Sequence, residues 1–235
     1  MDAVLERALD DARSIVQGGM DGIIVENFLD APFYPGSVPA DTVGALSVVV
    51  REVVLSVAVP VGVNVLRNDA MAGLAIAAAT GARFVRVNVH TGVMLGDQGW
   101  LHGEAHETVR LRKRLGVEAA ILADVMVKHA TPPPGLELAQ AARDASERGL
   151  ADGLIVSGAS TGLPVDAERV RTVKEAVPDA PVWIGSGLSA ENVAELLPLA
   201  DGAIVGSALM LEGRAGQPVE IERVQRLVEA ARSVR

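Results

Sequence analysis

Short apolar segments alternate with longer amphipathic segments along all 235 residues, and this alternation constrains the fold more than any other feature. Three of the apolar segments, at residues 21–25, 152–156 and 201–205, each read Asp-Gly followed by three apolar residues. Short apolar runs bounded by turn residues predict strands, and strands separated by helical patterns predict βα units in a parallel sheet. Repeated units of this kind predict an α/β fold, a TIM-type (β/α)8 barrel.

The predicted elements are one strand short of a complete barrel. We predict strands at residues 22–27, 61–66, 84–90, 120–127, 153–157, 182–184 and 203–205. Helices are predicted at residues 1–18, 40–57, 70–80, 104–115, 136–148, 166–176, 191–197 and 221–233.

An unpaired, buried strand edge is costly, and the chain begins on a helix where a barrel should begin on a strand. We therefore expect one domain over residues 1–235, N-terminally short by a first strand that lies upstream. The alternative is a barrel whose gap another element covers.

Composition excludes several classes of function. The chain has no cysteine, so it has no disulfide, thiol nucleophile or thiolate metal site. A net charge of −9 without a basic stripe, and only 3% aromatic residues, argue against a nucleic-acid partner. No apolar run is long enough to span a bilayer, and the acidic N-terminus is unlike a signal peptide. We expect a soluble, cytoplasmic protein without an integral membrane segment that forms a homo-oligomer.

The last two predicted strands both end in small residues. Gly185, Ser186 and Gly187 follow one strand, and Gly206 and Ser207 follow the other. Such residues let backbone amides approach a ligand closely, and the last two strand ends of a parallel barrel are a common phosphate site. These five residues are therefore the predicted phosphate-binding group.

The predicted strand at residues 84–90 separates polar from apolar side chains. Its three valines share one face, and Arg86, Asn88 and His90 share the other. The outer face of a barrel strand packs on helices, so we expect the polar face to line the lumen.

The same alternation in neighbouring strands brings more polar side chains to the carboxyl end, where barrel active sites lie. The expected set is Glu26, Asn64, Asn88, His90, Asp124 and Lys128, with Met126 on the same face.

Four of these residues, Glu26, His90, Asp124 and Lys128, are the candidate catalytic groups. Lys128 could form a Schiff base if burial lowers its pKa, or bind an anionic oxygen of the substrate. His90 could transfer a proton. Glu26 and Asp124 could act as bases or hold Mg²⁺, the one cofactor these residues suggest.

A structural role competes with the functional one at several positions. Arg86 lies deeper along its strand, so we favour a structural ion pair between Arg86 and Asp124. A buried charge without a partner is costly, which favours function for the charged groups nearer the strand ends.

Residues at the strand exits are candidate substrate ligands: Asn27, Asn64, Arg67, Asn68, Asn88, Ser157 and Gly158. Asp69 precedes a predicted helix and could serve only as its N-cap. The Gly/Ser-rich segment at residues 157–162 could bind substrate or only form a turn.

The longest predicted loop, residues 91–103, contains four glycines. It could close as a lid with Trp100 at its tip, or be a surface excursion. His102 and His106 are four residues apart, but no glutamate directly follows His102 as the zinc-protease pattern requires. We therefore predict no zinc site there.

Taken together, these segments resemble the BtpA family, named for photosystem I biogenesis and placed among the ribulose-phosphate-binding barrels. The resemblance rests on residues 21–28, 30–33, 60–69, 86–92, 121–125 and 127–130 and on the two terminal Gly/Ser strand exits. It implies the barrel fold and a phosphate-type ligand. Family members generally begin with a strand and a His-containing, Pro-rich loop, which this sequence does not show.

Two functions are open at this point. The first is an enzyme acting on a phosphorylated sugar or nucleotide-like small molecule, by lyase, isomerase or glycosyl-bond chemistry. The second is a photosystem I biogenesis, assembly or stability factor without catalysis, which would need an exposed apolar surface. Fold analogy does not supply the reaction.

Overall fold

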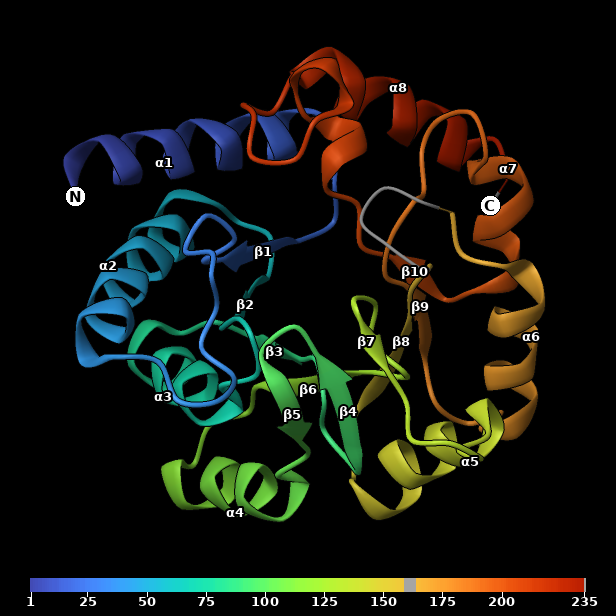
Figure 1. Cartoon of the computed structure of the whole chain (residues 1–235). Coiled ribbons are helices and arrows are strands. Elements are labelled where there is room, and N and C mark those ends of the chain that lie inside the picture. Colours follow the sequence, from blue (N-terminus) through green and yellow to red (C-terminus); the bar gives the residue numbers. More distant parts are fainter. Residues whose placement is uncertain (159–163, 235) are drawn as a thin grey trace.

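The computed structural model describes residues 1–158 and 164–234. Seven strands form one curled, parallel sheet in the order β1-β2-β3-β6-β8-β9-β10, surrounded by helices (Figure 1). These strands are β1 Ile23–Glu26, β2 Val61–Asn64, β3 Phe84–Val87, β6 Ala120–Asp124, β8 Gly153–Val156, β9 Val182–Ile184 and β10 Gly202–Ala203.

Helices connect these strands, as the periodicity predicts. The main helices are α1 Asp2–Gln17, α2 Ala40–Ser56, α3 Ala70–Thr80, α4 Ala105–Leu115, α5 Leu138–Arg143, α6 Ala167–Ala176, α7 Val193–Leu196 and α8 Ile221–Arg232. A π-helical turn, Asp144–Arg148, extends α5, and short 3₁₀ helices lie at Leu197–Leu199, Ser207–Leu209 and Leu211–Gly213. In the described part of the chain, every helix is too short or too polar to cross a bilayer.

The core lies between the sheet and the helices. Val63, Val85, Ile121, Leu154 and Ile184 have no exposed surface, because the outward face of each strand packs against the surrounding helices. Burial of these apolar side chains is the main stabilising contribution to such a fold.

The ring of helices closes, but the sheet does not. Helix α1 contacts α8, and the Asp11 carboxylate of α1 accepts a hydrogen bond from the Val219 amide at 2.8 Å. Among the described residues, β1 and β10 are the two free edges of the sheet. The prediction of a TIM-type barrel with seven of its eight strands is confirmed.

The predicted ends of two strands are wrong. The strand predicted at residues 84–90 is β3, which ends at Val87, and the strand predicted at residues 120–127 is β6, which ends at Asp124. Beyond these ends, alternation places some side chains correctly, such as Asn88, and misplaces others, such as His90.

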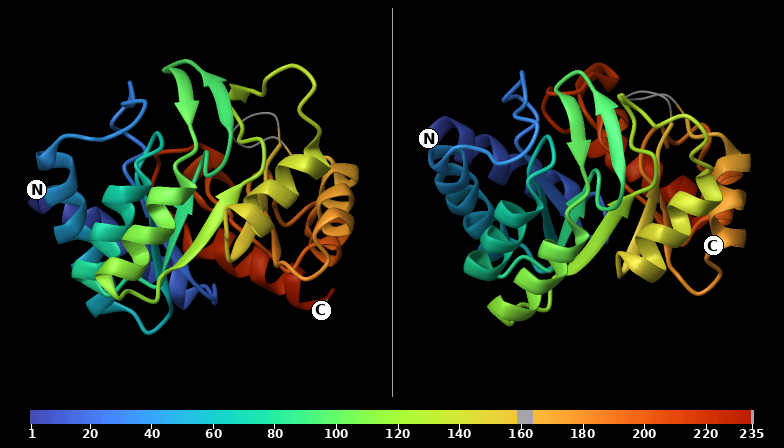
Figure 2. Two further views of the ribbon diagram at one scale, coloured as in Figure 1. Left: turned by 90° about the horizontal axis from the view of Figure 1, so that it is seen from below. Right: turned by 60° about the horizontal axis from the view of Figure 1, so that its bottom comes forward.

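The segment predicted as a loop at residues 91–103 contains a hairpin instead. Strands β4 Val93–Gly96 and β5 Gly99–His102 pair antiparallel, and β7 Ala130–Thr131 pairs with the other edge of β4. Gly99 has a φ of 91°, which the tight turn needs and glycine adopts easily. Trp100 lies within β5 and not at the tip. Figure 2 shows the hairpin standing above the parallel sheet.

Candidate active site at the carboxyl end of the barrel

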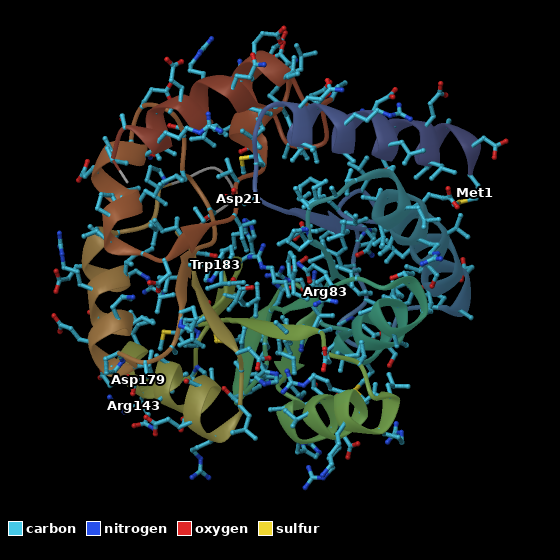
Figure 3. All side chains as sticks on the ribbon, turned by 180° about the vertical axis from the view of Figure 1, so that it is seen from behind. Met1, Asp21, Arg83, Arg143, Asp179 and Trp183 are labelled. Carbon is cyan, nitrogen blue, oxygen red and sulfur yellow. The ribbon has the colours of Figure 1, made fainter. Side chains whose placement is uncertain are left out.

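A cavity of about 1700 Å³ runs through the interior of the barrel. Pro60 and Arg83, which precede strands, line it at the amino ends, and Lys128 and Ser207, which follow strands, line it at the carboxyl ends. Figure 3 views the amino ends, marked by Asp21, Arg83 and Asp179. Because β1 and β10 do not pair, residues of α1 line the cavity as well.

A buried ion pair between Arg86 on β3 and Asp124 on β6 lies at the centre of the polar site. The Arg86 Nε and Nη2 atoms donate to the two Asp124 carboxylate oxygens at 2.9 and 3.0 Å. Their side chains are 5% and 1% exposed. Burial alone would lower the pKa of Arg86, but the Asp124 carboxylate overrides this effect and raises it. The predicted ion pair is confirmed.

Asp124 also accepts hydrogen bonds from two neutral side chains. The Asn88 amide donates at 2.8 Å, and the Ser157 hydroxyl donates at 3.2 Å. Each carboxylate oxygen therefore has two donors, which holds the inner faces of β3, β6 and the exit of β8 together.

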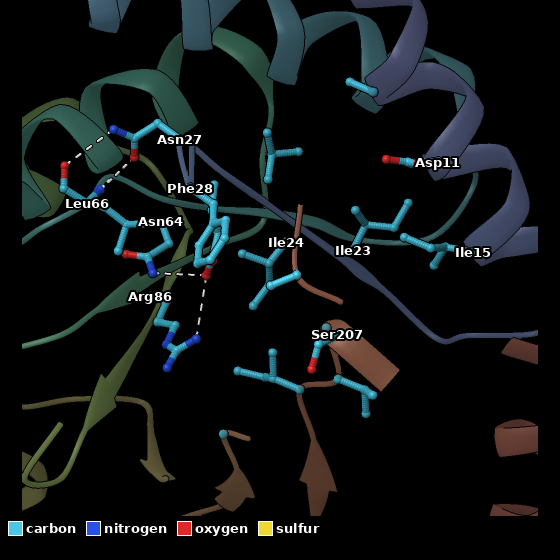
Figure 4. Close-up of a pocket in the computed structure, with 18 of the residues that line it drawn as sticks. Asp11, Ile15, Ile23, Ile24, Asn27, Phe28, Asn64, Leu66, Arg86 and Ser207 are labelled. Carbon is cyan, nitrogen blue, oxygen red and sulfur yellow. Dashed lines mark hydrogen bonds and ion pairs between the residues drawn. The ribbon is translucent and has the colours of Figure 1, made fainter. Parts of the chain in front are cut away.

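Glu26 connects β1 to this pair. Its Oε1 atom accepts from Asn64 on β2 at 3.0 Å and lies 3.5 Å from Nη1 of Arg86 (Figure 4). The Glu26 side chain is 26% exposed, so it faces the cavity and still contacts the buried guanidinium.

Arg67 and Lys128 add two cationic groups at the same mouth. Arg67 donates from Nη2 to the backbone carbonyl of Lys128 at 2.6 Å. Burial lowers the pKa of both groups, and the nearby Arg86 cation lowers each further, while Asp124 and Glu26 oppose this shift. The surroundings therefore disfavour positive charge on these two side chains.

The small residues of the two last strand exits line the same cavity, namely Gly185, Ser186, Gly187, Gly206 and Ser207. Figure 4 shows Ser207 facing the same pocket as Arg86. A Cβ built on Gly206 meets no atom within 4 Å, so its backbone borders open space. Gly187 has a φ of 74°, which favours glycine.

The structure does not bring His90 to this cluster. Its Nε2 atom bonds the Gly149 carbonyl at 2.8 Å, and the ring lines a second cavity of about 710 Å³ near α4. Burial lowers its pKa. The expectation that His90 shares the lumen with Arg86 and Asn88 is wrong, because β3 has already ended at Val87.

Met126 was expected on the lumen face and is not there. It packs against the small apolar cluster that includes Val89 and Val127. Here, too, the strand ends before the residue, at Asp124.

Several predicted substrate ligands hold the chain in place. The Asn27 side chain donates a hydrogen bond to the Leu66 carbonyl and accepts one from the Leu66 amide, although it also lines the cavity. Asn68 bonds the backbone of Val89 and the carbonyl of His102.

The structure describes the first two residues after β8. Ser157 donates to Asp124, and the Gly158 amide donates to the Ser186 hydroxyl at 3.0 Å. Residues 159–163 of the predicted Gly/Ser-rich segment lie outside the described residues. Asp69 accepts from the Ala72 amide at 2.8 Å and is the N-cap of α3, as the sequence suggested.

The donor set does not fit the suggested Mg²⁺ ion. Of the two suggested ligands, Asp124 already accepts two hydrogen bonds at each oxygen, so Glu26 alone of the pair has a carboxylate oxygen to offer. Within residues 1–158 and 164–234, no three His, Asp or Glu side chains lie close enough to bind one ion together.

Asp97 and Gln98, at the turn of the β4–β5 hairpin, are among the cavity-lining residues that the sequence did not predict. The signal was present, since apolar residues flank the turn sequence Asp-Gln-Gly, which favours a hairpin. The hairpin thus places polar groups over the mouth.

Comparisons with known proteins agree with the fold. A model of the BtpA family matches residues 1–233. The chain is 47% identical over 228 residues to the photosystem I biogenesis protein BtpA of Synechocystis sp., covering 97% of this chain and 79% of that protein. It is also 47% identical over 234 residues to the uncharacterized protein TK2179 of Thermococcus kodakarensis, covering 100% and 88%.

Solved structures resemble it in fold alone. N-(5'-phosphoribosyl)anthranilate isomerase from Pyrococcus furiosus has a TM-score of 0.63 at 18% identity, covering 97% of this chain and 96% of that one. (S)-3-O-geranylgeranylglyceryl phosphate synthase from Thermoplasma acidophilum, in complex with sn-glycerol-1-phosphate, has a TM-score of 0.64 at 18% identity, covering 97% and 88%.

Proposed function

The chain belongs to the BtpA family, and from this premise we propose that it is an enzyme that binds a phosphorylated sugar or nucleotide-like small molecule at the carboxyl end of its barrel. One observation carries the proposal. The Gly/Ser strand exits after β9 and β10 and the ionic groups Glu26, Arg86 and Lys128 line one cavity.

The phosphate is proposed to bind at Gly185–Gly187 and at Gly206 and Ser207. Open space beside Gly206 lets an anion reach the backbone, where amide groups can donate to phosphate oxygens. Two fold neighbours support this assignment: one is an isomerase of N-(5'-phosphoribosyl)anthranilate, and the other is a synthase in complex with sn-glycerol-1-phosphate.

The reacting part of the substrate is proposed to face Glu26 and Lys128. A carboxylate can accept a proton from a substrate, and burial lowers the pKa of the Lys128 amine, which favours its neutral, proton-accepting form. This fits lyase, isomerase or glycosyl-bond chemistry, all of which need proton transfer beside an anchored phosphate. Arg86 and Asp124 hold the two sides of the site at fixed distance.

A thermal-shift comparison tests the binding step. Ligand that binds only the folded state raises the melting temperature, and at one hundred times Kd the gain is about 2.7 kcal/mol. We expect ribose 5-phosphate to raise the Tm and ribose to leave it unchanged. Gly206→Asp places a carboxylate in the open space and should abolish the shift.

Gly44→Asp is the matched control, because it adds the same charge on α2, where a new Cβ also meets nothing within 4 Å. It should keep the full ligand-induced shift. A panel of sugar phosphates and nucleotides that leaves the wild-type Tm unchanged would contradict the proposal. So would a Gly206→Asp variant that responds like the wild type.

The alternative is an assembly role without catalysis, as the name of the Synechocystis relative suggests. Exposed apolar side chains near the mouth, Leu29, Tyr34 and Trp100, offer a contact surface. Lys128→Ala distinguishes the two, since it should abolish turnover while leaving surface contacts intact. Retained biological activity in this variant would favour the assembly role.

A further inference from the structure

We propose that the Nζ atom of Lys128 forms an imine with the carbonyl carbon of an open-chain phosphorylated aldehyde or ketone held in the cavity. The inference rests on the proposed function, in which the Gly/Ser exits after β9 and β10 bind the phosphate at the other side of the same cavity.

The backbone around Lys128 is arranged to present this side chain. Met126 and His129 have φ values of 51° and 60°, in the left-handed region that non-glycine residues rarely adopt. Arg67 fixes the segment between them by its 2.6 Å hydrogen bond to the Lys128 carbonyl. Strained backbone of this kind persists only where its surroundings impose it, and it clusters at functional sites.

Among the described residues, the Lys128 amine has no hydrogen-bond or ion-pair partner, although it lies near Asp124 and Glu26. Asp124 is fully engaged by Arg86, Asn88 and Ser157. A lysine beside a carboxylate that is already committed to another cation is available to a substrate.

The surroundings also favour the neutral amine. Burial is the main cause that lowers the pKa of Lys128, and the cations of Arg86 and Arg67 add to it. Only a neutral amine has the lone pair that attacks a carbonyl.

The proposed step balances without an external reagent. The Nζ lone pair adds to the carbonyl carbon and gives a carbinolamine; the amine loses two protons in all, and the carbonyl oxygen leaves with them as water. Glu26 is placed to carry these protons. Its Oε1 atom accepts hydrogen bonds from Asn64 and Arg86, whereas its Oε2 atom accepts none from the described residues. The C=N bond replaces the C=O bond, and nothing is oxidised or reduced.

Chemical trapping tests the proposal on the intact chain. Pyridoxal 5′-phosphate serves as a phosphorylated aldehyde probe, and borohydride reduces any imine to a stable amine. The chain has three lysines, so Lys113 and Lys174 are internal controls. Lys113 is exposed on α4, and Lys174 pairs with Asp201 at 2.8 Å.

We expect peptide mass spectrometry to find the probe on Lys128, with the mass of the aldehyde less water plus two hydrogens. Lys128 should react at least tenfold faster than Lys113 at neutral pH, and inorganic phosphate should slow the reaction. Lys128→Met should remove this fast phase and leave the slow reaction of Lys113. Labelling of Lys128 that is no faster than that of Lys113 would overturn the inference.

A second measurement separates this failure from failure of the proposed function. If ribose 5-phosphate raises the Tm of the wild type and of Lys128→Met, yet Lys128 is not labelled, the imine is excluded and phosphate binding stands. If neither the shift nor the label is seen, both proposals fail.

Discussion

Asp124→Ala should destabilise the protein strongly, because it leaves the Arg86 cation buried without its main partner. The Arg86 side chain is 5% exposed, and its remaining carboxylate contact, to Glu26, is a distant 3.5 Å. Breaking a buried ion pair by removing one partner typically costs about 3–5 kcal/mol. The contact with Glu26 should keep the loss near the lower end of that range.

Urea denaturation followed by circular dichroism measures this loss. With a slope near 2 kcal/mol/M, a loss of about 3–5 kcal/mol lowers the midpoint by roughly 1.5–2.5 M. Asp10→Ala is the control, since its ion pair with Arg13 is exposed on both sides and should contribute less than about 1 kcal/mol.

The double variant Arg86→Met/Asp124→Leu examines the physical cause. If the cost comes from an uncompensated buried charge, removing both charges should recover at least half of the stability lost in Asp124→Ala. Full recovery is not expected, because Asn88 and Ser157 still lose their acceptor. A double variant as unstable as Asp124→Ala, or a single variant that loses less than about 1 kcal/mol, would refute the reasoning.

Three further changes probe other parts of the structure. Asp69→Ala should cost about 2 kcal/mol by urea denaturation, because it removes the cap of α3 and the acceptor of the Val38 amide. Gly185→Ala should lower stability by about 1–3 kcal/mol, since its Cβ would overlap the Ile155 side chain. Lys128→Met should stabilise the protein at pH 7, and the gain should shrink as pH rises toward 10.5, the ordinary pKa of a lysine.

The sign of the Lys128 effect follows from linkage. Its pKa is lower in the folded than in the unfolded state, so the unfolded state binds more protons between the two values. Wild-type stability therefore rises with pH between the two pKa values. The cost of burying the Lys128 charge, which Lys128→Met removes, is greatest below the folded-state pKa. A gain in Lys128→Met that stays constant from pH 7 to pH 10 would show that its pKa is not lowered.

The sequence predicted the architecture well because periodicity reports burial directly. Apolar strands and amphipathic helices alternate, and each strand that was predicted from this pattern exists in the parallel sheet. Side-chain alternation also predicted that Arg86 and Asp124 meet. The same rule failed at His90 and Met126, since alternation holds only while the backbone remains a strand, and β3 and β6 end before these residues, at Val87 and Asp124.

The polar residues near the mouth fall into two groups. In one group the polar side-chain atoms already form hydrogen bonds within the protein, and in the other they do not. Asn27 and Asn68 bond backbone groups of neighbouring strand exits, which fixes the rim of the barrel. Composition and spacing cannot reveal this, because an asparagine that holds a loop and one that binds a substrate look alike in a sequence. Only the hydrogen-bond partners separate the two roles.

The same criterion identifies the groups that can react. A buried polar atom with all its bonds satisfied gains nothing from a substrate, whereas one without a partner is stabilised when a substrate supplies it. Among the described residues of the cluster, Lys128 Nζ, Glu26 Oε2 and the buried Asn88 Oδ1 form no hydrogen bond, and all three residues line the cavity that Gly206 and Ser207 also line. Under the proposed function, Lys128 and Glu26 act on the substrate while Arg86 and Asp124 hold the site together. Lys128→Met should then abolish turnover while retaining the fold, and Asp124→Ala should lower both together.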